Sequence, residues 1–134
     1  MLRVVVDTNI YISAFLFGGK PLKALEYAQE GKYLLFTSEF ILDEVKGVLE
    51  KKFNTPKGYT EQVIKNILGF SHLIVPKIKI DIVRNDPSDN RILECAVTAK
   101  ANIIVSGDKD LLFIKNYQDI TILKAEGFLR NYVV

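Results

Sequence analysis

Residues 2–15 read LRVVVDTNIYISAF, an apolar run that ends in an acid and leads into a helical pattern. The run from Leu2 to Val6 is short and rich in β-branched residues, which favours a strand buried on both faces. Asp7 bounds this strand, and Ile10 to Phe17 continue as a helical stretch. A buried strand followed at once by a helix is the first unit expected of a parallel α/β fold.

Strands and helices keep alternating along the rest of the chain. Helices are predicted over residues 21–32, 38–53, 60–70, 86–101 and 108–116, and further strands over 33–37, 71–76, 102–107 and 119–123. This order predicts a three-layer α/β/α sandwich with a mainly parallel central sheet. Such sheets bind ligands at the carboxyl ends of their strands, which is where Asp7 and Asp108 are expected.

Several boundaries follow from capping and turn residues. GGKP at 18–21 and NTPKGYT at 54–60 are predicted loops, and Thr60 is the expected N-cap of the helix that follows. Asp86 caps the next helix, with Pro87 at its first position. The polar segment 77–87 is expected to be an edge strand or a surface loop, and Gly127 argues against a long regular helix near the C-terminus.

Composition favours one folded domain over residues 1–134. Hydrophobic residues make up 49% and charged residues 25%, which excludes a disordered chain, and no long apolar run suggests a membrane span. No signal peptide is readable at the N-terminus, so the cytoplasm is the expected compartment. Cys95 is the single cysteine and is expected to be a small buried packing residue.

The net charge of +2 is too small to identify nucleic acid as a partner by itself. Six basic side chains lie close in sequence to acidic residues and would form a rim able to hold phosphates, unless they only promote solubility. They are Lys20, Lys23, Lys46, Arg84, Arg91 and Lys109.

Four acids stand out by their positions: Asp7 and Asp108 at strand ends, and Glu44 and Asp89 on helices. On the predicted helical wheels, Glu44 and Asp89 fall inside the apolar arcs, whereas Asp43 and Glu94 point away from them. A carboxylate in an apolar arc needs a cation, a proton or hydrogen bonds. For Glu44, the expected partner is a cation.

Each of the other acids also has a purely structural interpretation. Asp7 could cap the turn that follows it, Asp89 could complete a capping box with Asp86, and Asp108 could cap the helix after it. Asp110 is expected to be a first-turn helix acid rather than a ligand. Oxygen ligands without nearby histidine or cysteine favour Mg²⁺ or Mn²⁺ over zinc, and the only histidine, His72, lies in a different segment.

The motifs VVVDTNIYISAF, FILDEV, DPSDNRILECA and IVSGDKDLL together resemble a PIN domain, and the resemblance extends from Leu2 to about Leu123. It implies a metal-dependent ribonuclease that cleaves RNA with an activated water and leaves a 3′-hydroxyl and a 5′-phosphate. It also implies a function for the four acids and two neighbours. The catalytic set would be Asp7, Glu44, Asp89 and Asp108, with Asp7, Asp89 and Asp108 holding Mg²⁺ or Mn²⁺ and with Thr8 and Asn9 supporting them.

GGKP and the last two motifs resemble the branch of VapC-type toxins, which implies a homodimer and an antitoxin partner. The chain departs from that pattern between Asn54 and Asn85. Two other functions within the same fold stay open: a non-catalytic RNA-binding or assembly module, and a housekeeping RNA-processing nuclease. A phosphatase of the haloacid dehalogenase type would need a second aspartate two residues after Asp7, where this chain has Asn9.

Overall fold

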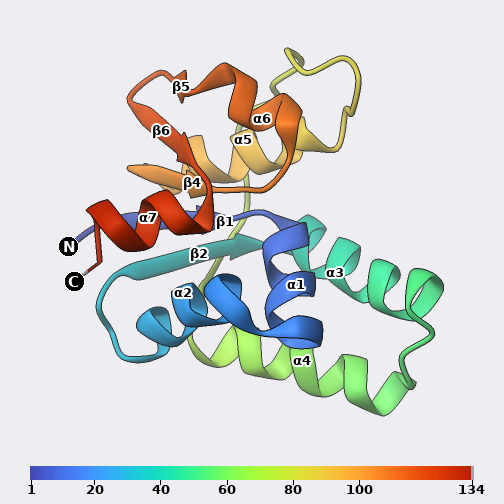
Figure 1. Ribbon diagram of the computed structural model, residues 1–134. Helices are drawn as coiled ribbons and strands as arrows, with labels where there is room; N and C mark the ends of the chain where they lie inside the picture. Colours follow the sequence, from blue (N-terminus) through green and yellow to red (C-terminus); the bar gives the residue numbers. More distant parts are fainter. Residues whose placement is uncertain (134) are drawn as a thin grey trace.

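The computed structural model describes residues 1–133 and contains one six-stranded sheet with helices on both faces (Figure 1). The strand order is β3-β2-β1-β4-β6-β5, and every pair is parallel except β5 with β6. The strands are β1 Arg3–Val6, β2 Leu34–Ser38, β3 His72–Ile74, β4 Ile103–Val105, β5 Asn116–Tyr117 and β6 Ile120–Leu123. The predicted α/β sandwich with a mainly parallel sheet is confirmed.

Helices separate almost every pair of strands. They are α1 Thr8–Phe17, α2 Gly19–Gln29, α3 Glu39–Lys52, α4 Lys57–Gly69, α5 Asp89–Thr98, α6 Lys109–Ile114 and α7 Ala125–Asn131. In Figure 1, α1, α2 and α4 lie on one side of β1 and β2, and α5 lies on the other. No helix within residues 1–133 has both the length and the apolar character needed to cross a lipid bilayer.

Strand β1 is the centre of the sheet, as its β-branched sequence predicts. Val4, Val5 and Val6 have no exposed surface, and Val5 pairs with Phe36 of β2 and with Ile104 of β4. Because β1 and β4 are adjacent and parallel, their carboxyl ends lie side by side. The residues that follow them, Asp7 and Asp108, therefore start from the same edge of the sheet.

Two predicted loops are shorter than expected. Helix α2 begins at Gly19, since positive φ angles at Gly18 and Gly19 let the chain turn directly from one helix into the next. Helix α4 begins at Lys57, and its N-cap is Pro56 rather than Thr60. Thr60 is instead fully buried inside the first turns of α4, where its hydroxyl lies 2.9 Å from that of Thr55.

Helix α5 also begins two residues after Pro87, its predicted first residue. Residues 86–88 form a turn, in which Oδ1 of Asp86 accepts hydrogen bonds from the backbone N–H and the hydroxyl of Ser88, and the helix begins at Asp89. Segment 77–87 is a loop without strand structure, which agrees with one of the two predicted alternatives.

The C-terminal part contains two elements that the sequence pattern did not predict. The short strand β5 pairs with β6, and α7 forms a helix of seven residues despite Gly127. Phe128 of α7 is fully buried and makes an edge-to-face contact with Tyr33, with ring centroids 5.1 Å apart. This aromatic packing offsets the low helix propensity of glycine. Cys95 is fully buried, as predicted, and burial raises the pKa of its thiol to about 12.

Candidate metal centre

Three segments bring carboxylates to the carboxyl edge of the sheet. Asp7 follows β1 and Asp108 follows β4, and the backbone N–H of Asp7 donates to the carbonyl of Val105 at 2.9 Å. Asp89 is the first residue of α5, which packs against β1 and β2. Segments far apart in the sequence thus place acidic side chains in one region, as the strand-end rule predicts for this class of sheet.

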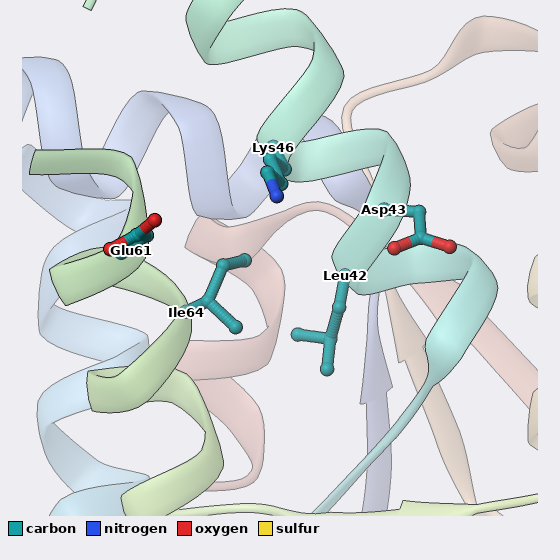
Figure 2. Close-up of a pocket in the computed structure, with 5 residues that line it drawn as sticks. All are labelled: Leu42, Asp43, Lys46, Glu61 and Ile64. Atoms are coloured by element: carbon teal, nitrogen blue, oxygen red, sulfur yellow. The ribbon is translucent and has the colours of Figure 1, made fainter. Parts of the chain in front are cut away.

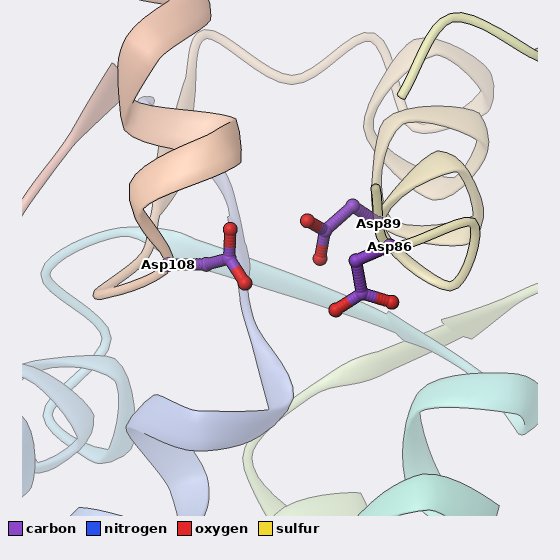
Figure 3. A group of neighbouring side chains, drawn as sticks. All are labelled: Asp86, Asp89 and Asp108. Atoms are coloured by element: carbon purple, nitrogen blue, oxygen red, sulfur yellow. The ribbon is translucent and has the colours of Figure 1, made fainter. Parts of the chain in front are cut away.

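The tightest group of carboxylates consists of Asp86, Asp89 and Asp108. One carboxylate oxygen from each residue lies within 4.8 Å of the other two, and Figure 3 shows Asp86 and Asp89 facing Asp108. Asp89 is 4% exposed, and its Oδ2 has no hydrogen-bond partner among residues 1–133. A buried carboxylate oxygen without a partner is costly, so this atom indicates a place for a cation or a proton.

Asp86 was missed as a member of this group, because the sequence suggested only a helix cap. It does cap, through Ser88, but it also faces the same space as Asp89. The spacing of three residues between the two aspartates was the available signal, since residues three apart in a helical turn lie on one side. The group that meets this distance within residues 1–133 is Asp86, Asp89 and Asp108, and the predicted ligand set of Asp7, Asp89 and Asp108 stays a prediction.

Asp7 is buried next to this group and is held by a serine. The hydroxyl of Ser106 donates to Oδ2 of Asp7 at 2.6 Å and accepts from the backbone N–H of Asp108 at 2.9 Å. Ser106 is fully buried and joins the two strand-end acids. Ser106 was not among the predicted site residues, although its place directly after β4 and two positions before Asp108 was a usable signal.

Asp108 caps a helix and also lies among the clustered acids. Its Oδ1 accepts from the backbone N–H groups of Asp110 and Leu111, at 2.8 and 3.2 Å, and so caps α6. Its carboxylate also belongs to the three-aspartate group. The cap fixes the orientation of the side chain, because one oxygen is tied to the helix.

The acids raise one another's pKa values. Burial raises the pKa of Asp89 to about 8, and the charges of Asp108, Asp86 and Asp7 add to this effect. Burial also raises the pKa of Asp7 to about 6, with contributions from Asp108 and Glu44 that the Ser106 hydrogen bond partly offsets. A divalent cation among these groups would relieve both the repulsion and the desolvation.

Glu44 lies outside the three-aspartate group and is only half-buried on α3. Its Oε1 accepts a 2.5 Å hydrogen bond from the hydroxyl of Thr8, and the cation expected beside Glu44 stays a prediction. Thr8 is buried and orients Glu44. The side chain of Asn9 is exposed and makes no hydrogen bond to these acids within residues 1–133.

Glu94 corrects the helical-wheel argument for α5. It was predicted to point away from the core, but it is only 6% exposed. It forms an ion pair with Arg91 at 2.9 Å and accepts from the backbone N–H of Ile80, also at 2.9 Å. Loop 77–87 folds over this polar side of α5, so a face that would be solvated on a free helix is covered.

The expected basic rim is only partly free to meet phosphates. Arg91 is paired with Glu94, and Lys20 is paired with Glu126 at 3.4 Å. Lys46 lines a hollow of about 210 Å³ between α3 and α4, where Leu42 and Ile64 point toward each other (Figure 2). None of the acids of the metal centre lines this hollow. A groove of about 290 Å³ beside α6 contains Arg84.

Comparison with known proteins is consistent with this geometry. A family model described as PIN domain matches residues 3–110, a span that includes Asp7, Glu44, Asp86, Asp89 and Asp108. The chain is also 34% identical over 120 residues to the uncharacterized protein MJ1680 of Methanocaldococcus jannaschii. That match covers 86% of this chain and 76% of the archaeal protein.

Proposed function

Because this chain belongs to the PIN domain family, whose members are generally metal-dependent nucleases, we propose that it is an endoribonuclease that hydrolyses RNA phosphodiester bonds. The observation that carries this proposal is the buried Asp89 oxygen without a partner, beside the carboxylates of Asp86 and Asp108. A protein that used this fold only for RNA binding would have no use for such a repulsive group. The acids therefore favour a nuclease over a non-catalytic module.

The donor set fits a hard divalent cation. The three closest donors are all carboxylate oxygens, and Mg²⁺ and Mn²⁺ prefer such ligands. In our proposal Asp86, Asp89 and Asp108 hold the ion, and Asp7, which is linked to Asp108 through Ser106, would join them or hold a second ion. When bound, a divalent cation lowers the pKa of a water and stabilises the charge that develops on a transferring phosphoryl group.

The remaining residues of the site supply orientation and proton handling. The two hydrogen bonds of Ser106 hold Asp7 in a fixed position relative to Asp108, the N-cap of α6. Thr8 occupies one oxygen of Glu44 and leaves the other free to accept a hydrogen bond from the attacking water. Glu44 therefore positions this water in the proposed reaction, and the aspartates would hold the divalent ion.

The test is a cleavage assay with purified protein, Mn²⁺ and an end-labelled single-stranded RNA. The wild type should cut the RNA, and EDTA should abolish cutting. Asp89→Asn should lower the rate on the order of 10²-fold or more, which is the effect expected when one stabilising electrostatic group is lost. Asp43→Asn changes an exposed carboxylate on α3 and serves as the matched control. Equal cleavage by the wild type and Asp89→Asn would point to a contaminating nuclease and contradict the proposal.

We further propose that this ribonuclease is the toxin of a toxin-antitoxin pair, acting as a homodimer in the cytoplasm and blocked by a protein antitoxin. The support is the similarity of GGKP and of IVSGDKDLL to VapC-type toxins. Expression of the wild type should arrest growth, and Asp89→Asn should relieve the arrest. Normal growth at a level of soluble wild-type protein that cuts RNA in the assay would instead indicate a housekeeping nuclease.

A further inference from the structure

A groove of about 290 Å³ runs between loop 77–87 and α6. Residues 82–85 form one wall, and Asp110, Phe113 and Ile114 form the other. Both walls continue directly into the metal centre, because Asn85 precedes Asp86 and Asp110 follows Asp108 by two residues. A ligand in this groove would therefore contact residues that are neighbours in sequence of Asp86 and Asp108.

The loop wall is fixed by side chains of α5. Asn90 is 1% exposed, and its Oδ1 accepts from the backbone N–H groups of Ile82 and Val83 at 3.0 and 2.9 Å. Its Nδ2 donates to the carbonyl of Val83 at 2.9 Å, and Arg91 donates to the carbonyl of Ile80 at 3.1 Å. These bonds hold the loop in one conformation without secondary structure, so the groove is preorganised.

Phe113 presents an aromatic ring that the fold does not use. It is 86% exposed, more than any other large hydrophobic side chain described, whereas Leu111 on the same short helix is fully buried. An exposed phenyl ring contributes no burial energy to the fold, but it offers a flat surface to a partner. Unpaired nucleobases stack on such rings.

Arg84 is the positively charged residue that lines the groove. It is exposed, and within residues 1–133 its guanidinium has neither an ion pair nor a hydrogen bond. Asp110 on the opposite wall is negative, so a phosphate in the groove would be attracted to the loop side. A phosphate on Arg84 and a base on Phe113 together match the two parts of one nucleotide.

We propose that this groove binds one unpaired nucleotide of the RNA, adjacent to the bond that is cut, with its base stacked on Phe113 and a phosphate on Arg84. The inference rests on the proposed ribonuclease function and assigns it a nucleotide subsite formed by Phe113 and Arg84. A duplex keeps its bases stacked inside the helix, so it cannot deliver a base to Phe113.

The first test measures binding of a fluorescein-labelled oligouridylate of 12 nucleotides by anisotropy in Ca²⁺, and binding of its duplex with oligoadenylate. Phe113→Ala should weaken single-strand binding roughly tenfold or more, the order expected for one lost stacked base, and should leave duplex binding unchanged. Phe113→Trp should bind as tightly as the wild type. Arg84→Ala should lower the slope of log affinity against log salt by about 0.7, the value for one phosphate contact on a single strand.

Two matched variants control for general surface effects. Phe17→Ala removes another exposed aromatic ring, which packs on Phe53 away from the groove. Arg130→Ala removes an exposed arginine near the end of α7, which is paired with Glu126. Neither should change affinity, and all five variants should melt close to the wild type. Single-strand binding that is unchanged in Phe113→Ala, or reduced equally for single strand and duplex, would overturn the inference.

Cleavage of the same oligonucleotide in Mn²⁺ separates this inference from the function on which it rests. Phe113→Ala should raise KM with little change in kcat. If the wild type cuts the RNA and both groove variants cut it equally well, the groove proposal is wrong and the nuclease stands. If the wild type binds in a manner that depends on Phe113 but never cuts, the nuclease is wrong and the nucleotide site stands.

Discussion

The hydroxyl of Ser106 donates a 2.6 Å hydrogen bond to Oδ2 of Asp7, and both side chains are buried. This bond lowers the pKa of Asp7 against the larger effect of burial, which raises it. Ser106 thus favours the ionised form of an acid that would otherwise hold its proton more tightly. The same hydroxyl accepts from the backbone N–H of Asp108, so it links two members of the site.

Ser106→Ala should therefore shift the acid limb of the pH profile for cleavage to higher pH. Without the serine, the pKa of Asp7 rises further above about 6, and a higher pH is needed to ionise it. The buried acceptor left behind should also lower the free energy of unfolding by about 1–3 kcal/mol. Ser71→Ala, which removes a hydroxyl bonded within α4, is the control. An unchanged pH profile would mean that Asp7 does not titrate in the reaction.

The metal-free protein should lose stability as the pH rises from about 4 to about 8. The pKa of Asp89 is raised from 3.8 to about 8, so the folded state holds a proton that the unfolded chain releases. Asp89 imposes no penalty below pH 4, and the penalty grows until the pH passes the folded pKa. Asp89→Asn carries no charge at this position. In EDTA it should melt several degrees above the wild type at pH 8 and close to it at pH 4.

Adding Mn²⁺ at pH 8 should reverse the order of the two melting temperatures, so that the wild type melts above Asp89→Asn. The wild type gains stability by binding the ion, whereas Asp89→Asn has lost a ligand and gains less. Thermal unfolding with and without Mn²⁺ measures both effects on the same samples. If Asp89→Asn melts below the wild type in EDTA at pH 8, Asp89 is stabilised by partners other than a cation, and its proposed function is wrong.

Glu44→Gln should affect the rate of cleavage more than the affinity for metal. Glu44 lies outside the three-aspartate group and is hydrogen-bonded to Thr8, so its proposed function is to orient water. We expect a decrease in kcat on the order of 10²-fold, typical for loss of a proton-handling group. Mn²⁺ affinity should change little, as measured by calorimetry. A loss of affinity as large as that of Asp89→Asn would make Glu44 a ligand.

Asn90→Ala should loosen loop 77–87. The substitution removes three hydrogen bonds to the backbone of Ile82 and Val83 and leaves those groups without their partners. We expect a loss of about 2–4 kcal/mol in the free energy of unfolding. Hydrogen exchange should accelerate first at the amides of Ile82 and Val83. Gln62→Ala, on the exposed side of α4, should leave exchange in this loop unchanged.

Local pattern was enough to predict the sheet and most helices. β1 and β4 are short, apolar and β-branched, which predicts buried strands of a parallel sheet. An acid follows each strand, and the general rule for parallel sheets then predicts that Asp7 and Asp108 lie at the same edge. The inward position of Asp89 also followed from helical spacing, and its exposure of 4% confirms it.

The predictions that were wrong or missing concern polar residues whose environment depends on contacts between distant segments. Glu94 was assigned to solvent because a helical wheel cannot show that loop 77–87 covers that side of α5. Asp86 was seen only as a cap, since its approach to Asp108 depends on how α5 and β4 meet. Ser106 is an ordinary buried strand residue until the fold brings it to Asp7. In each case tertiary packing decided the environment of a polar group.

Calorimetric titration of the metal-free protein with Mn²⁺ tests the central claim most directly, because it reports on the three aspartates without any RNA or contaminating nuclease. The wild type should bind Mn²⁺, and Asp86→Asn and Asp89→Asn should each bind it roughly tenfold more weakly or worse, since each loses a charged ligand. Asp43→Asn should bind as the wild type does. Equal affinity of the wild type and both ligand variants would contradict a metal centre formed by Asp86, Asp89 and Asp108.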